Sequence, residues 1–284
     1  MSLELPFTKM HGAGNDFVVL DGLRHELPPL EPLARRLSDR HFGVGFDQLL
    51  VVRPSSAADF RMEIYNADGS QVEMCANGIR AFFKYLRDAG HTDREQVRVE
   101  TLGGVVVPRW AGEDRVSVDM GSPVLAPAKI PTLLGDAASE GPVLDVELEA
   151  AGETLRVSTV SMGNPHAVVY VPDVEAAAVE RLGPAVEMHP AFPNRVNVEF
   201  VQVLSRDRVR QRTWERGTGE TLACGSGACA AVVASILRGV SDPAVAVELR
   251  GGELQIAWPG AGESVTMTGP ATHVFDGRIH IEGE

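Results

Sequence analysis

"MCANGIRAF" (residues 74–82) is echoed by "LACGSGACA" (residues 222–230), and this pair of stretches is the strongest indication of the fold. In each, a cysteine stands on a turn of small residues that runs directly into a helix-like sequence. Cys75 and Cys224 lie 149 residues apart. The same offset relates other pairs: Gly14 to Gly163, Gln48 to Asn197, Gly78 to Gly227 and Gly90 to Gly239.

The echo extends beyond the cysteines. "VETLGGVVVPRW" (residues 99–110) matches "VELRGGELQIAW" (residues 247–258) at an offset of 148. Matches in order over more than 100 residues, with one slip, predict a duplicated chain. We expect an N-terminal repeat over residues 1–124 and a C-terminal repeat over residues 125–270. The tail, residues 271–284, alternates like a strand, and we expect it to join the first repeat.

Each repeat contains several short β-branched strand patterns and one well-marked helix, which directly follows its cysteine. In the first repeat, apolar residues recur with helical spacing at Ile79, Phe82, Phe83 and Leu86, and Gly90 marks the helix end. In the second, "ACAAVVASILR" (residues 228–238) is apolar nearly all round, which predicts a buried helix. The pattern predicts an α+β fold of two pseudo-symmetric domains, each a curved, mainly antiparallel sheet around a central helix.

Composition excludes several classes of function. The net charge is −13 without a Lys/Arg cluster, which argues against nucleic-acid partners. No signal peptide or membrane-length apolar run is visible, so we expect a soluble cytoplasmic protein. Three cysteines without ligand spacing argue against a disulfide scaffold and a metal site. Nucleotide-binding motifs and a lysine suited to pyridoxal phosphate are missing, so no cofactor is expected.

Two equivalent cysteines suit two-base proton transfer at a carbon atom. One group removes a proton from one face of the carbon while the other delivers a proton to the opposite face. A helix N-terminus favours a thiolate and offers backbone N–H groups to a carboxylate. We therefore expect Cys75 and Cys224 to face each other across a cleft between the repeats. Cys229 lies within its helix and is expected to be a core residue.

The chain closely resembles the diaminopimelate epimerases, which are cofactor-independent amino-acid epimerases. The matching stretches are "KMHGAGNDFVV", "GVGFDQLL", "NADGSQVEMCANG", "SMGNPHAV", "RVNVEF" and "ERGTGETLACGSGA", and the likeness covers essentially the whole chain. The resemblance implies an isomerase that interconverts LL- and meso-2,6-diaminopimelate in lysine and peptidoglycan-precursor synthesis. It also implies a homodimer.

The resemblance further implies the roles of individual residues. Cys75 and Cys224 would be the acid/base pair, and His166 and Glu215 would tune the ionisation of the thiols. The residues implied to contact substrate are Asn15, Gln48, Asn66, Ala76, Asn77, Asn164, Asn197, Glu215, Arg216, Gly225 and Ser226. Where the family usually has glycine, this chain has Ala76. Because alanine tolerates positive φ poorly, we expect the backbone role to persist in a slightly altered turn.

The repeat is broken at three of these positions. Arg216 aligns with Ala67, Glu215 with Asn66, and His166 with Phe17. A substrate with one reacting end needs one clamp for its distal carboxylate, and the planar guanidinium of Arg216 suits that role. The competing interpretations are a surface ion pair between Arg216 and Glu220, a core histidine, and plain turn asparagines.

Three other functions remain open from the sequence. A proline or hydroxyproline racemase would share both cysteines but would not need Arg216. A dithiol redox protein would use Cys75 and Cys224 as a disulfide. A non-catalytic binding module would be expected to have lost one of the two thiols, and both are present.

Overall fold

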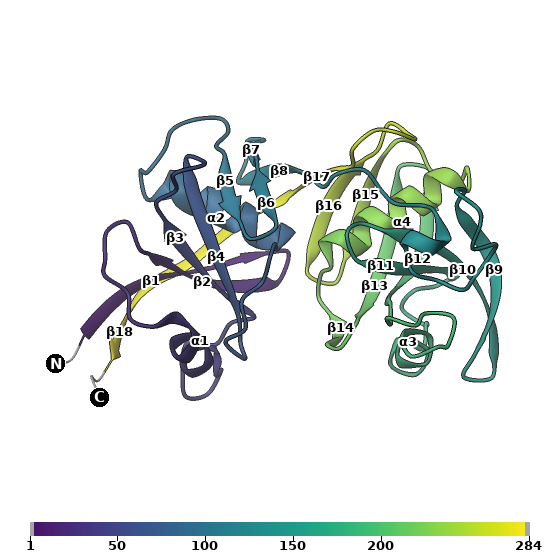
Figure 1. Cartoon of the computed structure of the whole chain (residues 1–284), viewed down its shortest axis with the longest axis horizontal. Coiled ribbons are helices and arrows are strands. Elements are labelled where there is room, and N and C mark those ends of the chain that lie inside the picture. The colour runs from purple at the N-terminus through teal and green to yellow at the C-terminus, as the bar shows by residue number, and fades with distance from the viewer. Residues whose placement is uncertain (1–2, 282–284) are drawn as a thin grey trace. The chain divides into compact units, whose positions relative to one another are not determined.

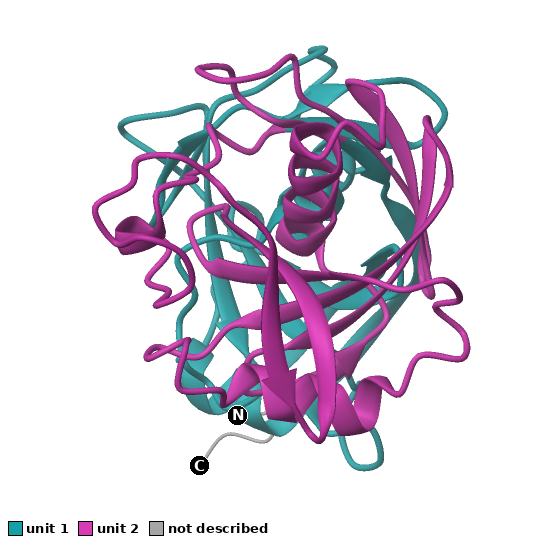
Figure 2. Cartoon of the chain, turned by 90° about the vertical axis from the view of Figure 1, so that its right-hand side faces the viewer, with its two compact units in different colours: residues 1–118, 268–284 teal, residues 119–267 magenta. Residues whose placement is uncertain are grey.

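The computed structural model describes residues 3–281, which fold into two compact units (Figures 1 and 2). Unit 1 comprises residues 3–118 and 268–281, and unit 2 comprises residues 119–267. The fold is α+β, with a large sheet and two α-helices in each unit. The repeat boundaries at residues 124 and 270 remain a prediction about the sequence copies. No helix within residues 3–281 is long and apolar enough to span a membrane.

Unit 1 contains the helices α1 (Leu30–Ser38) and α2 (Ala76–Asp88). Its strands are β1 (Leu3–Gly12), β2 (Asn15–Asp21), β3 (Gln48–Arg53), β4 (Phe60–Asn66), β5 (Val99–Thr101), β6 (Gly104–Val106), β7 (Arg109–Trp110), β8 (Arg115–Asp119) and β18 (Thr272–Ile281). The main sheet runs in the order β18-β1-β2-β3-β4-β5-β6. Most neighbours are antiparallel, and β2–β3 and β4–β5 are parallel.

Unit 2 contains the helices α3 (Val179–Glu187) and α4 (Gly225–Leu237) and the 3₁₀-helix η1 (Pro127–Lys129). Its strands are β9 (Val143–Ala150), β10 (Glu153–Ser161), β11 (Pro165–Tyr170), β12 (Asn197–Ser205), β13 (Arg208–Glu215), β14 (Gly219–Thr221), β15 (Ala244–Leu249) and β16 (Gly252–Ala257). A further strand, β17 (Thr266–Pro270), begins in unit 2 and ends in unit 1. Their order is β17-β16-β15-β13-β12-β11-β10-β9, and β14 pairs with β13. The parallel pairs are β11–β12 and β13–β15.

The strand registers repeat with the sequence offset. Phe17 pairs with Gln48 in unit 1, and 149 residues later His166 pairs with Asn197 in unit 2. The parallel strand pair β4–β5 in unit 1 corresponds to the parallel pair β13–β15 in unit 2. Paired residues are offset by 149 positions between β4 and β13 and by 148 positions between β5 and β15. The slip seen in the sequence is therefore a one-residue deletion between corresponding strands. Helices α3 and α4 also begin 149 residues after α1 and α2.

The ends of the two central helices follow their sequence signals. Gly90 and Gly239 have φ angles of 72° and 74° and follow the last helical turn. The amide of Gly90 donates a hydrogen bond to the carbonyl of Arg87, and the amide of His91 donates one to the carbonyl of Leu86. The two corresponding hydrogen bonds are present at the end of α4. Positive φ at the residue after the helix is strained for residues with a side chain. The glycines therefore stop both helices at corresponding places.

The sequence predicts one helix per unit, and the structure adds α1 and α3. Helix α1 buries Leu30, Leu33 and Leu37 against the sheet, as an amphipathic helix should. Both helices are only nine residues long, and α3 contains Pro184 in its interior. A short helix interrupted by proline gives a weak periodic signal. Its stability comes mostly from tertiary packing.

Each sheet has a helix packed on each of its two faces. Helices α1 and α3 pack on one face, while α2 and α4 pack on the other, which is called the inner face below. In unit 1, Val18 and Leu49 point toward α1, so Phe17 and Leu50 point toward α2 by strand alternation. The inner face carries the residues closest to the cysteines, because each cysteine begins the helix that covers it.

Candidate active site

In unit 1 the cysteine occupies the N-cap of α2. Cys75 has an extended backbone, and its sulfur accepts a hydrogen bond from the amide of Gly78 at 3.3 Å. Asn15 lies beside it, with Oδ1 3.8 Å from the sulfur and 3.3 Å from Nδ2 of Asn77. The structure thus groups three predicted residues around one helix N-terminus, where the partial positive charge favours an anion.

Gln48 and Asn66 form a second polar pair in unit 1. They are directly opposite each other on β3 and β4, and Nε2 of Gln48 donates to Oδ1 of Asn66 at 3.1 Å. Nδ2 of Asn66 in turn donates to Ser70 at 3.1 Å. Both predicted side chains are therefore held by side-chain partners, and Asn66 is more than a plain turn residue.

Ala76 is the first residue of α2, so its backbone is helical. A helical first residue needs no positive φ, and glycine has no advantage there. The expected alteration of the turn is therefore not required by the backbone at this position. The next residue, Asn77, is buried within the first helical turn.

A partly exposed ion-pair network supports Asn15. The neighbouring Asp16 accepts two hydrogen bonds from Arg40, at 2.8 and 3.0 Å, and pairs with Lys9. Nδ2 of Asn15 donates to Asp47 at 2.8 Å, and Arg40 also contacts Asp47. Burial opposes ionisation of Asp16, but Arg40 and Lys9 outweigh it and lower its pKa to about 2.

Replacing Asp16 by asparagine should lower the unfolding free energy at neutral pH by about 2 kcal/mol. The folded-state pKa is depressed, so the charged carboxylate stabilises above its unfolded pKa. That contribution is lost as the pH falls toward 2. Urea unfolding of wild type and Asp16→Asn between pH 7 and pH 2 measures the difference, which should shrink with acidity. Asp93→Asn, at an exposed aspartate, is the control; a difference independent of pH would contradict this account.

In unit 2 the cysteine likewise occupies an N-cap. Cys224 precedes α4, is buried, and has its sulfur 3.6 Å from the hydroxyl of Ser226. Gly225 is the first helical residue. A Cβ added at Gly227 would lie 3.2 Å from the cysteine sulfur and 2.6 Å from Oε1 of Glu199, so glycine is required there. Cys229 is fully buried in α4, which confirms its predicted core position.

Glu215 lies next to Cys224 and shapes its ionisation. Burial raises the pKa of Glu215, the charge of Glu199 adds to this effect, and a 2.6 Å hydrogen bond from Thr221 opposes it. Burial, followed by the negative charges of Glu215 and Glu199, raises the pKa of Cys224 well above its usual value. These effects favour the thiol over the thiolate form of Cys224.

His166 is fully buried on β11 and uses both ring nitrogens. Nδ1 lies 2.8 Å from Oε1 of Glu199, and Nε2 lies 2.9 Å from Oδ1 of Asn164. Two predicted residues, His166 and Asn164, thus meet in direct contact. Their shared partner, Glu199, stands on β12 inside "RVNVEF" and was not predicted. Its sequence signal is a charged residue between two apolar residues, Val198 and Phe200, of a buried strand segment.

Asn197 and Arg216 are joined through the backbone. Oδ1 of Asn197 accepts from the amide of Arg216 at 2.9 Å, and its Nδ2 donates to the carbonyl of Pro165 at 3.0 Å. Asn197 is buried, so it fixes the β13–β14 turn that carries Arg216. The Arg216 side chain is exposed and donates to the carbonyl of Asn194 at 3.0 Å.

The alternative ion pair of Arg216 with Glu220 does not form. Glu220 is instead 2.7 Å from Arg212 and 3.1 Å from Arg250. Within residues 3–281, Arg216 has no carboxylate partner, so its charge is available to a ligand.

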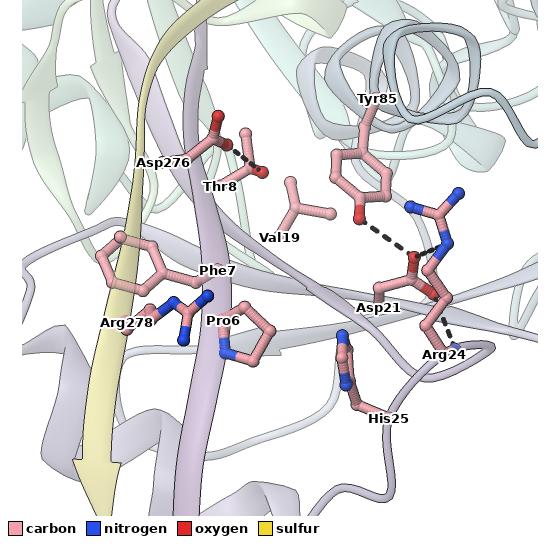
Figure 3. A pocket seen from close by; sticks show the side chains of 11 residues that line it. Pro6, Phe7, Thr8, Val19, Asp21, Arg24, His25, Tyr85, Asp276 and Arg278 are labelled. Atoms are coloured by element: carbon pink, nitrogen blue, oxygen red, sulfur yellow. Dashed lines mark hydrogen bonds and ion pairs between the residues drawn. The ribbon is translucent and has the colours of Figure 1, made fainter.

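Unit 1 also contains a cavity of about 340 Å³ away from these residues (Figure 3). It is lined by segments of β1, β2, α2 and β18 and includes Asp21, Arg24 and Tyr85. Asp21 accepts from Tyr85 at 3.2 Å and contacts His91 at 2.7 Å. None of the predicted site residues lines this cavity.

Comparison with solved structures identifies the fold. A PhzF-family phenazine biosynthesis protein from Bacillus anthracis matches 98% of this chain and 100% of its own, with a TM-score of 0.71 and 16% identity. A hydroxyproline epimerase from Agrobacterium vitis, solved with bound trans-4-hydroxy-L-proline, matches 98% of this chain and 91% of its own. Its TM-score is 0.67 and its identity 18%. The chain therefore has the two-unit fold shared by these proteins.

Sequence comparison narrows the class to one family. The diaminopimelate epimerase family matches residues 7–126 and 158–274. The diaminopimelate epimerase of Cupriavidus metallidurans is 51% identical over 283 residues, covering 98% of each chain. The chain belongs to the diaminopimelate epimerase family, whose members are isomerases.

Proposed function

We propose that this chain interconverts LL- and meso-2,6-diaminopimelate without a cofactor, and so acts in lysine and peptidoglycan-precursor synthesis. The observation that carries the proposal is the pair of N-cap cysteines, Cys75 and Cys224, at corresponding positions of α2 and α4. Family membership supplies the substrate. A cytoplasmic homodimer is part of the same proposal and is tested by measuring the mass of the enzyme in solution.

In this proposal the two units bring both sulfurs to one α-carbon. The Cys75 thiolate takes the α-proton from one face, and the Cys224 thiol gives its proton to the opposite face. The products are a Cys75 thiol, a Cys224 thiolate and the inverted carbon, so the reverse reaction uses the exchanged roles. The raised pKa of Cys224 supports its part as the initial proton donor.

The helix N-termini would stabilise the charge that develops on the reacting carboxylate. The first turn of a helix presents backbone N–H groups that the helix itself does not use. We assign this role to Ala76 and Asn77 in unit 1 and to Gly225 and Ser226 in unit 2. Donors aimed at developing negative charge are worth about 3 kcal/mol each in comparable enzymes.

The remaining polar residues would make the other contacts with the substrate. Arg216 would bind the distal carboxylate, because its guanidinium has no carboxylate partner and can donate two parallel hydrogen bonds. We assign the other substrate contacts to the amides and the carboxylate described above: Asn15, Gln48, Asn66, Asn164, Asn197 and Glu215.

The test is an assay on LL-diaminopimelate in D₂O with a thiol reductant present. We expect formation of the meso isomer and incorporation of deuterium at one α-carbon. Proline and trans-4-hydroxyproline are the comparison substrates, and turnover of these alone would contradict the proposal. Loss of activity on oxidation is expected; activity that requires oxidation would favour a dithiol redox protein.

A further inference from the structure

The inner faces of the two sheets differ in chemistry. In unit 1 the residues under α2 are apolar and buried: Phe17, Leu50, Met62 and Ile64. At the positions 149 residues later, under α4, unit 2 has four equally buried polar residues: His166, Glu199, Gln211 and Thr213. The repeated fold therefore accommodates an apolar face at these positions. Buried polar and charged residues in such a place need another explanation.

Glu199 and His166 form the most deeply buried pair of this set. Both side chains are fully inaccessible, and Oε1 of Glu199 lies 2.8 Å from Nδ1 of His166. Oε2 of Glu199 has no hydrogen-bond partner within residues 3–281. A carboxylate removed from water is very unfavourable unless a positive charge compensates it. Among the described residues, the basic group in contact with the Glu199 carboxylate is the His166 ring.

The hydrogen-bond partners of His166 are the geometric basis for inferring its protonation state. Nδ1 faces a carboxylate oxygen, and Nε2 faces Oδ1 of Asn164 at 2.9 Å. When Glu199 is ionised, both partner atoms are acceptors, and hydrogen bonds to both of them require a proton on each ring nitrogen. Only the imidazolium form has two N–H groups.

Building on the proposed function, we propose that Glu199 is a positioning residue for the epimerisation. It holds His166 as an imidazolium, and the resulting pair allows the Cys224 sulfur to change between thiol and thiolate during turnover.

The geometry around Gly227 explains how the pair reaches the sulfur. Glu199 Oε1 and the Cys224 sulfur border the same small space beside the Gly227 backbone. The other titratable group facing them is Glu215, on β13. With a neutral His166, Glu199 would add an uncompensated negative charge next to Cys224 and oppose the thiolate. The imidazolium removes that opposition without placing a net charge in the core.

The first experiment reads the protonation state directly. The chain has eight histidines, so the protein is labelled with ¹⁵N-histidine and the His166 signals are assigned by comparison with His166→Asn. In the substrate-free wild type at pH 7, we expect both ring nitrogens of His166 to be protonated. In Glu199→Gln, which keeps the side-chain shape, we expect one nitrogen to lose its proton. A singly protonated His166 ring in the wild type overturns the proposal.

The second experiment is a double-mutant cycle on kcat and KM. His166→Asn leaves Glu199 unpaired and should lower kcat roughly 100-fold. Glu199→Gln should lower kcat about tenfold with KM unchanged. The double variant should recover at least about fivefold over His166→Asn, because it carries no unpaired charge. If the fold-losses in kcat of the two single variants instead multiplied in the double variant, charge compensation would be contradicted. Glu253→Gln, which breaks the β16 ion pair with Arg208, is the control.

The two experiments separate the failure of this inference from that of the proposed function. If wild type does not turn over diaminopimelate, the proposed function fails, while the NMR experiment still decides the state of His166. If wild type is active but His166 carries a single ring proton, only this inference fails. Thermal unfolding of each variant shows whether a lost rate reflects a lost fold.

Discussion

Replacing Cys75 or Cys224 by serine should lower the rate of α-proton exchange on diaminopimelate by about 10³-fold. Serine keeps the size of the side chain but is a far weaker acid than a thiol, so proton transfer at one face is lost. General acid–base groups typically contribute 10²- to 10⁴-fold, and each cysteine acts as one such group. The measurement is deuterium incorporation from D₂O, followed separately in the LL and meso substrates.

Cys229→Ser is the matched control for both cysteine variants. Cys229 lies in the interior of α4 and is fully buried, five residues after Cys224. A serine there can donate to the carbonyl one helical turn earlier, so the fold should persist. We expect the rate per folded molecule to be nearly unchanged. An inactive Cys229→Ser together with an active Cys224→Ser would reverse the assignment.

Replacing Arg216 by alanine should lower kcat/KM for diaminopimelate by about 10²-fold, mainly through a higher KM. A charge-assisted pair of hydrogen bonds to a carboxylate is worth about 1.5–3 kcal/mol, which corresponds to this loss. The side chain is exposed and donates a hydrogen bond to the Asn194 carbonyl, so stability should change little. Steady-state kinetics with thermal unfolding measures both effects.

Two further variants sharpen the Arg216 prediction. Arg216→Lys keeps the positive charge but loses the planar fork, so it should fall between wild type and alanine. Arg156→Ala, which removes an exposed ion pair with Glu147 on the same unit, should leave KM unchanged. A large loss of stability in Arg216→Ala, with normal kinetics for the remaining folded enzyme, would instead give this side chain a structural role.

Some features of the site and of the fold could be predicted from the sequence, and others could not. Cys75, Cys224 and the glycines that end α2 and α4 were predictable because caps and helix stops depend on local conformation. The helices α1 and α3 were not, because they are short and depend on packing against the sheet. The parallel pairing of β2 with β3 also escapes local patterns, since it joins strands separated by α1.

The asymmetry of the two units was only partly visible in the sequence. Alignment of the repeats shows that His166 replaces Phe17, and the resemblance singles out Glu215. Glu199 sits at the position of Leu50, but its significance appears only when β11 and β12 pair in parallel and place it against His166. Hydrogen-bond partners of a buried polar group come from neighbouring strands, which sequence spacing does not specify.

The sequence by itself determined the duplication, the place of both cysteines at helix N-termini, and the family of the chain. These depend on the order of residues and on backbone conformations that a few neighbours fix. The tertiary structure alone decided that Cys224 is buried beside Glu215 and Glu199, and burial followed by these two charges raises the pKa of its thiol. It also decided that Glu199 meets the ring of His166. The ionisation of a buried group depends on lost water and nearby charges, and packing brings those charges together from distant parts of the chain.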